Sequence, residues 1–347
     1  MTAHPDRTDW PGVRLHVVTG KGGTGKSTVA AALALALASS GRNVLLCEVE
    51  GRQGIARMFD VDPLPYDERR ITKGAPDEEG RAGQVYALHI DPESALLEYL
   101  AMYYKLGRAG KALDRFGVID FATTIAPGVR DVLLTGKVYE AVQRPRRSDK
   151  RADKGRHRDV ITYDAVVLDA PPTGRICQFL GVNSELAGLA KVGPIKSQAD
   201  KVMELLRSPR TAVHLVTILE EMPVQETADG IAELHRAGLP VGGVVVNLVR
   251  PRALGASALD QVRDDEVDPT AITSELSRAK VDVDAELVRS LLDEARDHAV
   301  RRQLEDEQRT LVEAEDLPTY ELPRLAGGID HGALIELAQL LRTQGMA

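Results

Sequence analysis

The chain is poor in cysteine and aromatic residues and has no long uncharged hydrophobic segment, and each scarcity excludes a class of protein. Of its 347 residues, 2 are cysteines and 4% are aromatic. Cys47 and Cys177 are too few for a disulfide framework and do not have C-x-x-C spacing. Both lie among apolar residues, so we interpret them as buried, unreactive thiols. No stretch of about 18 apolar residues is free of charge, so no membrane-spanning helix is expected.

The N-terminus and the overall charge restrict location and partners. Charged residues precede Trp10 where a signal peptide would have its apolar core, so we expect a cytoplasmic protein. The net charge of -8 argues against a general nucleic-acid binder, and we expect no specific nucleic-acid partner. The length suits a single α/β domain spanning 1–347.

The most informative feature is a glycine-rich loop that reads GKGGTGKST and fits the phosphate-loop (Walker A) pattern. The apolar run Val13–Thr19 precedes it and the Ala/Leu-rich run Ser27–Ala38 follows it, which gives the strand–loop–helix context the motif needs. Lys26 would reach the β- and γ-phosphates, and Ser27 would hold Mg²⁺. We therefore predict a nucleoside triphosphate site at Gly20, Gly22, Gly23, Thr24, Gly25, Lys26, Ser27 and Thr28.

The same glycines also satisfy the dinucleotide pattern G-x-G-x-x-G, with Glu48 or Glu50 available for a ribose hydroxyl after the next apolar strand. A dinucleotide loop has no use for a lysine–serine pair at the start of its helix. The longer motif is the more specific one, so we favour the phosphate loop.

Short Val/Leu-rich runs without alternation recur along the chain and indicate strands buried on both faces of a parallel sheet. They are Val13–Thr19, Val44–Val49, Ala165–Leu168, Ala212–Thr217 and Gly243–Asn247. Helical patterns separate most of them, which predicts a doubly wound, mostly parallel α/β fold. Two further helical regions, about 91–143 and about 270–313, are expected to be insertions that cover an edge of the sheet.

A basic tract, 144–158, joins the first helical region to the next core strand. It has two interpretations. It is a solvated loop, or it contacts anionic lipid headgroups or an acidic partner. Without apolar residues it could not anchor the chain to a membrane alone.

The strand Ala165–Leu168 ends in Asp169, followed by a Pro- and Gly-rich turn, APPTG. A phosphate-loop enzyme needs such a carboxylate near its Mg²⁺, so we predict that Asp169 serves on the metal side, through a water. Thr173 and Gly174 would then sense the γ-phosphate. A turn or helix-cap role is the alternative for Asp169.

The loop with its extra lysine, Lys21, resembles the deviant Walker A of the signal-recognition/MinD/BioD class, and DAPPTG resembles the second switch of the arsenite-pump and tail-anchored-protein-targeting ATPases. The resemblance implies ATP and Mg²⁺ as ligands, and a nucleotide-dependent dimer in which Lys21 acts across the interface. It also implies that Asn247 and Pro323 lie at the adenine base; a simple turn role at the end of its strand is the alternative for Asn247. The dimer would be a homodimer or would contain a related ATPase subunit.

Departures from the family pattern mark an atypical member. In the family's first switch an aspartate orients the attacking water, and here Glu50 takes that place with one more methylene. The histidine that usually follows the second switch is Arg175. The family's interface cysteine pair is missing, so we expect no zinc. Sparse methionines in 91–143 favour core packing over a peptide groove.

The sequence therefore predicts an ATPase in which Lys21, Lys26 and Glu50 are catalytic and Ser27 and Asp169 are on the metal side. It would couple ATP binding to a membrane protein or a membrane-surface partner. Two alternatives remain: a partitioning or Min-type ATPase, and an ATP-binding scaffold without turnover. Membrane-riding ATPases end in a basic amphipathic helix, whereas the C-terminal run His331–Arg342 has one basic residue besides its histidine.

Overall fold

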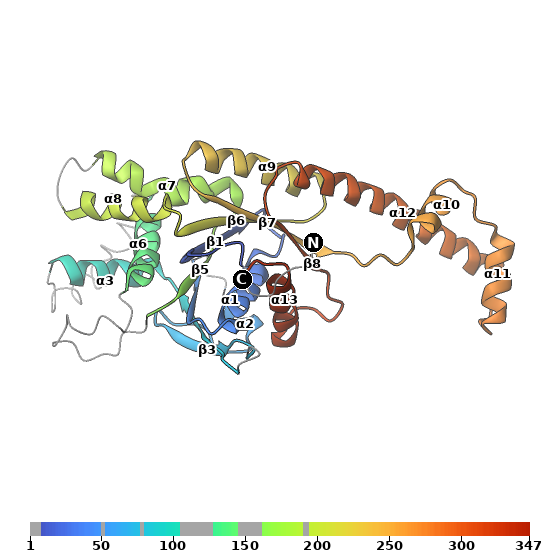
Figure 1. The fold of residues 1–347 in the computed structure, drawn as a ribbon, viewed down its shortest axis with the longest axis horizontal. Coiled ribbons are helices and arrows are strands. Elements are labelled where there is room, and N and C mark those ends of the chain that lie inside the picture. Colours follow the sequence, from blue (N-terminus) through green and yellow to red (C-terminus); the bar gives the residue numbers. More distant parts are fainter. Residues whose placement is uncertain (1–7, 50–52, 77–79, 105–127, 145–161, 190–193) are drawn as a thin grey trace.

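An eight-stranded sheet organises the protein, with strand order β3-β4-β2-β5-β1-β6-β7-β8 (Figure 1). The structure is a computed structural model that describes residues 8–49, 53–76, 80–104, 128–144, 162–189 and 194–347. The β3–β4 pair is antiparallel and the other neighbours are parallel. The strands are β1 (Leu15–Gly20), β2 (Val44–Glu48), β3 (Arg69–Lys73), β4 (Gln84–His89), β5 (Ala165–Asp169), β6 (Thr211–Thr217), β7 (Val241–Val249) and β8 (Thr319–Pro323).

The predicted α/β fold and its central strands are confirmed. Each apolar run identified in the sequence forms a strand, β1, β2, β5, β6 or β7, with bounds shifted by at most two residues. Every residue of β1, β2, β5 and β6 is buried, because helices cover both faces of the sheet. The strands that sequence analysis missed lie towards the edges, and the outermost two, β3 and β8, are partly exposed.

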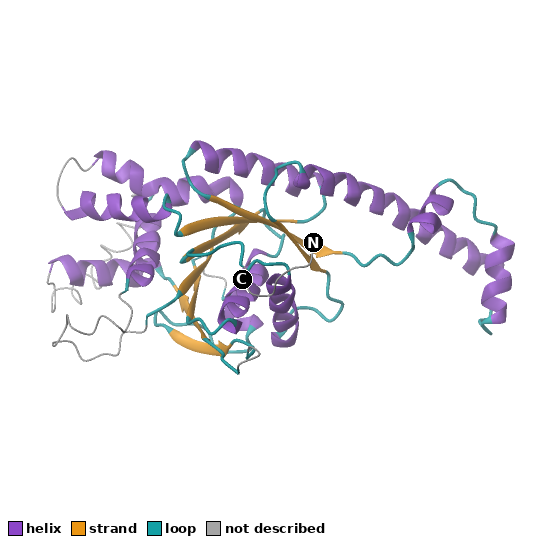
Figure 2. Cartoon of the chain, in the orientation of Figure 1, coloured by secondary structure: helices purple, strands orange, loops and turns teal. Residues whose placement is uncertain are grey.

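Helices cover the sheet in two layers (Figure 2). One face carries α1 (Lys26–Ser39), α2 (Gly54–Met58) and α13 (His331–Thr343), and the other carries α3 (Pro92–Tyr104), α6 (Val129–Gln143), α7 (Thr173–Leu189), α8 (Pro194–Leu206) and α9 (Glu221–Arg236). Helix α1 is buried continuously from Val29 to Ser39, because it packs against the sheet and against its neighbours α13 and α2 in the same layer. This enclosure explains its uninterrupted apolar sequence.

The helical region predicted at about 270–313 forms α11 (Pro269–Arg278) and α12 (Ala285–Glu313), which together with the preceding α10 (Ala256–Arg263) extend beyond the β7–β8 side of the sheet as an arm (Figure 1). The expectation that this region covers an edge of the sheet is wrong for most of it. Only the end of α12 joins the core, through Val312. A helix of 29 residues is about 44 Å long, whereas the neighbouring β7 rises about 30 Å, so α12 overshoots the sheet.

A polar network links the end of α6 to the segment that precedes β5. Glu68 accepts two hydrogen bonds from the Arg144 guanidinium (2.6 and 2.7 Å) and one from the Tyr163 hydroxyl (2.6 Å). Arg144 also binds Glu140, at 2.7 Å, on its own helix. These bonds secure both chain ends that flank the basic tract, whose residues 145–158 lie outside the described ranges. Among the described helices, none has the length and apolarity that crossing a bilayer requires.

Candidate nucleotide site

The glycine-rich loop joins β1 to α1 at the carboxyl edge of the sheet. Gly25 caps α1 in a left-handed conformation with φ of 87°. Thr24 turns the loop back on itself, because its hydroxyl donates to the Lys21 carbonyl oxygen at 2.9 Å. Lys26 Nζ also donates to that carbonyl, at 3.4 Å. The loop therefore has the strand–turn–helix geometry that directs N–H groups at phosphate.

The two residues predicted on the metal side, Ser27 and Asp169, come from α1 and β5. The Ser27 hydroxyl donates a 2.6 Å hydrogen bond to Oδ2 of Asp169, the buried last residue of β5. These oxygens fit Mg²⁺, which binds one or two protein oxygens together with waters and substrate phosphates. Among the described residues, no group of three or more histidine, cysteine, aspartate or glutamate side chains could enclose a metal by itself. The donor set therefore suits a metal that arrives with a nucleotide.

The segment predicted to be the second switch, residues 169–174, leaves β5 beside the loop. The Thr19 hydroxyl donates to the Pro171 carbonyl oxygen at 2.7 Å, and α7 then begins at Thr173. Arg175, which replaces the family's histidine, is directed to α6, where its Nη2 lies 3.8 Å from Asp131 Oδ2. Burial raises the pKa of Asp131, and Arg175 opposes that shift. The switch is therefore linked electrostatically to the helical region.

Lys21 is directed away from its own loop. Its Nζ lies 2.9 Å from Oε1 of Glu226 on α9, with both side chains about one-third exposed. Gly230, one turn further along α9, packs closely on the second switch: a Cβ there would lie 3.2 Å from Thr173 Cγ2. The ion-pair partner of Lys21 therefore stands on a helix in direct contact with the switch.

The residues predicted at the adenine base lie at the neighbouring strand ends. Asn247 is buried, and its Nδ2 donates to the Thr24 carbonyl oxygen at 2.9 Å. A bulge between β7 and β8 aims it there, with Leu248 in a left-handed conformation (φ 57°). Pro323 ends β8 opposite Val249. The structure thus joins Asn247 to the phosphate loop, and contact of Asn247 or Pro323 with adenine stays a prediction.

Glu50 lies outside the described residues, but both flanks of its segment are described. On one side, the buried Glu48 accepts a hydrogen bond from the Gly54 N–H at 2.8 Å. On the other, Gln53 adopts a left-handed conformation. Sequence analysis assigned Glu48 only to the disfavoured dinucleotide alternative. The signal that could have singled out Glu48 is its charge at the end of an otherwise apolar strand.

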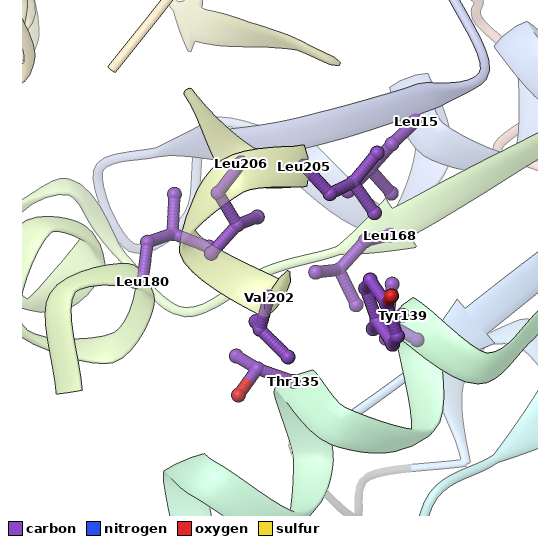
Figure 3. Close-up of a pocket in the computed structure, with 9 residues that line it drawn as sticks. Leu15, Thr135, Tyr139, Leu168, Leu180, Val202, Leu205 and Leu206 are labelled. Carbon is purple, nitrogen blue, oxygen red and sulfur yellow. The ribbon is translucent and has the colours of Figure 1, made fainter. Parts of the chain in front are cut away.

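Two features away from the loop have no binding role. Cys47 is buried and Cys177 partly buried, and burial raises the pKa of both thiols, which makes them weak nucleophiles at neutral pH. A cavity of about 10 Å³ lies below the sheet between α6, α7 and α8 (Figure 3). It is lined by apolar atoms, so it is a packing defect with no polar partners for a ligand or water.

Comparison with known proteins extends these observations. A family model described as anion-transporting ATPase matches residues 13–209. The chain is 50% identical over 341 residues to ATPase BagA of Mycobacterium tuberculosis, covering 97% of this chain and 96% of that one. It is 27% identical over 256 residues to the arsenical pump-driving ATPase of Acidiphilium multivorum (68% and 39% covered). It is 25% identical over 264 residues to ATPase GET3 of Kluyveromyces lactis (66% and 70% covered).

Proposed function

Because this chain belongs to the anion-transporting ATPase family and is an ATPase, we propose that ATP and Mg²⁺ close it into a dimer that acts on a partner protein. Lys26 and Ser27 hold the phosphates and the metal, and Asp169 orders the metal's water shell. Glu50 orients the attacking water. Lys21 reaches the nucleotide of the opposite subunit and stabilises charge that develops during phosphoryl transfer.

The placement of the two loop lysines carries this proposal. Lys26 Nζ lies within the loop, whereas Lys21 Nζ lies outside it, held by Glu226. The ion pair with Glu226 supports a role for Lys21 outside its own phosphate loop. Dimer closure would exchange the ion pair with Glu226 for contact with phosphate.

The partner is proposed to be a membrane protein or membrane-surface protein, with the chain in the cytoplasm. A relative is named an arsenical pump-driving ATPase, and driving a pump requires contact with a second protein. The C-terminal helix does not supply membrane contact here, because Leu334, Leu337 and Leu341 of α13 are buried against α1 and the sheet. This burial argues against a Min-type ATPase that rides on membranes.

Phosphate release from Mg²⁺-ATP by the purified chain tests the proposal, with nucleotide affinity and sedimentation measured alongside. Lys21→Ala is expected to bind ATP normally and to lose turnover, while Lys201→Ala, an exposed lysine on α8, keeps it. Specific activity should rise with protein concentration as dimers form. A monomer that turns over at a concentration-independent rate, or full activity in Lys21→Ala, would refute the trans role. If phosphate is released only after a related subunit is added, the functional dimer is a heterodimer.

A further inference from the structure

The arm of α10, α11 and α12, residues 256–313, carries the net charge of the protein. The chain has 52 aspartates and glutamates and 44 lysines and arginines; 16 and 8 of these lie in the arm, which leaves 36 of each sign elsewhere. The acidic residues of the arm are exposed except Glu305. A protruding element of one charge sign on a balanced body favours contact with a partner of the opposite sign.

One face of α12 combines acidic and apolar residues at a spacing that a second helix can match. Residues that follow each other at intervals of four and three lie in one stripe along a helix, and this is the spacing at which two helices pack side by side. We call this stripe the seam; it consists of Asp293, Asp297, Val300, Leu304, Glu307 and Leu311, all exposed. Its acidic end points towards the tip of the arm and its apolar end towards the sheet.

The fold does not use the seam. Both α10 and α11 pack on α12, whose buried residues Val288, Leu292 and Ala299 lie on a different face of the helix. The apolar residues of the seam, in contrast, are each more than half exposed. A row of exposed apolar side chains rimmed by charge is typical of an interaction site.

The root of α12 fixes the arm to the sheet. Arg309 Nε donates to Oε1 of Glu321 on β8 at 2.7 Å, and Nη1 of Arg250, which directly follows β7, lies 3.5 Å from Glu305 Oε1. Arg302 and Glu305 are both buried, and Arg302 Nη1 donates to Glu305 Oε2 at 2.7 Å. A surface that is held in place before binding loses less conformational entropy when a partner docks.

Charge argues against two occupants of the seam. Parallel pairing with the α12 of a second copy would place acid against acid, and antiparallel pairing would bury Asp293 and Asp297 against apolar side chains without a cation. Anionic lipid headgroups would be repelled by the same carboxylates. The chemistry that fits both ends of the seam is a helix with basic and apolar residues at the same spacing.

We propose that the seam is the docking surface for a helix of the partner protein, with lysine or arginine opposite Asp293 and Asp297 and apolar side chains opposite Val300, Leu304 and Leu311. That the helix belongs to a membrane protein rests on the proposed function. The cytoplasmic segments of membrane proteins are rich in lysine and arginine, which suits the acidic end of the seam.

Fluorescence anisotropy with a synthetic helix tests the docking chemistry. The lysine peptide is an alanine-rich helix of about three heptads with lysine opposite each acid of the seam and leucine opposite each apolar residue. It is made in both sequence directions, so that parallel and antiparallel pairing are tested. The glutamate peptide has glutamate at each lysine position. The full-length protein is expected to bind the better lysine peptide at least about tenfold more tightly than either glutamate peptide.

Substitution of the apolar part of the seam should remove this binding. Val300→Ser/Leu304→Ser/Leu311→Ser is expected to weaken the lysine peptide at least about tenfold. Leu291→Ser is the matched control, because Leu291 is 39% exposed on the same helix but lies outside the seam. Its affinity should stay within about twofold of wild type.

Substitution of the acids should reverse the preference, and it keeps the test decisive if the serine variant does not fold. Asp293→Lys/Asp297→Lys is expected to bind the glutamate peptide more tightly than the lysine peptide. Glu266→Lys/Asp282→Lys makes the same change in net charge at exposed positions of the arm outside the seam and should keep the wild-type preference. The two variants separate a docking surface from general attraction to an acidic protein.

Four results overturn the proposal. They are equal affinity of the wild type for both kinds of peptide, a reversed preference in Glu266→Lys/Asp282→Lys, nucleotide-free self-association that the serine variant abolishes, and binding to anionic vesicles that the serine variant abolishes. The last two would assign the seam to a second copy or to lipid. Lys21→Ala should bind the lysine peptide like wild type. If it binds the peptide but keeps full ATP turnover, the trans role of Lys21 fails and the seam stands.

Discussion

Two buried histidines should make the protein acid-labile well above the pH at which its carboxylates titrate. His16 of β1 and His214 of β6 face each other in the sheet, with Nδ1 of the first 3.1 Å from Nε2 of the second. The Gly243 N–H donates to His214 Nδ1 at 3.1 Å, so the His214 proton is on Nε2 and points at His16. Burial lowers the pKa of both rings, to about 3 for His214, and their mutual repulsion lowers that of His16 further.

The sign of the effect follows from proton linkage. In the unfolded chain each imidazole is protonated near the ordinary histidine pKa of 6.5. In the folded chain the pKa of each ring is lowered, so protonation requires a far lower pH. Acid therefore favours unfolding: the stability contributed by neutral His16 and His214 is complete above about pH 7 and falls as the pH drops. At pH 5 the loss from His214 is about 2 kcal/mol relative to pH 7.5, and His16 adds a loss of the same sign.

Urea unfolding between pH 7.5 and pH 5 measures this loss, with Trp10 fluorescence as a local probe. Trp10 is the single tryptophan of the chain, and its ring lies edge-on to His214 with centroids 5.1 Å apart. The double variant His16→Gln/His214→Gln should lose less stability over this range than wild type, by about 2 kcal/mol or more, whatever its stability at pH 7.5. His235→Gln, on an exposed position of α9, should follow wild type. Identical pH dependence in wild type and the double variant would refute the reasoning.

Three further predictions test other contacts. Glu226→Gln releases Lys21 from a surface ion pair, so dimerisation in Mg²⁺-ATP should strengthen by up to about fivefold in sedimentation equilibrium, and weaker dimers would contradict this. Gly25→Ala should lower nucleotide affinity at least about tenfold by fluorescence titration, because φ is 87° there and a Cβ would lie 2.3 Å from Asn247 Nδ2. Gly255→Ala, with open space around it, should bind normally. Glu68→Gln should cost about 2 kcal/mol in urea unfolding through its weakened bonds to Arg144, and an unchanged midpoint would show that the network does not stabilise the fold.

The sequence was sufficient for the elements whose signal is local. An apolar run such as Val44–Val49 indicates a strand buried on both faces, because such a run can only be shielded from water on both sides inside a layered fold. The phosphate loop is likewise a local pattern, since its glycines and the following helix set its backbone geometry. The α/β fold and the ATPase family followed from these signals. By contrast, β3 has a mixed sequence with no clear periodicity, and β8 alternates over only five residues, so pairing with a neighbour decides that both are strands.

Only the tertiary structure decided which side chains meet. Ser27 and Asp169 are 142 residues apart and Asn247 and Thr24 are 223 apart, yet each pair forms a hydrogen bond. The partner of Lys21 on α9 and the hydrogen bond from the Gly54 N–H to Glu48 were equally invisible in the sequence. Such contacts depend on strand order and on the angles at which helices pack, which no local pattern encodes. The sequence determined what chemistry is present, and the order of the strands decided where each group acts.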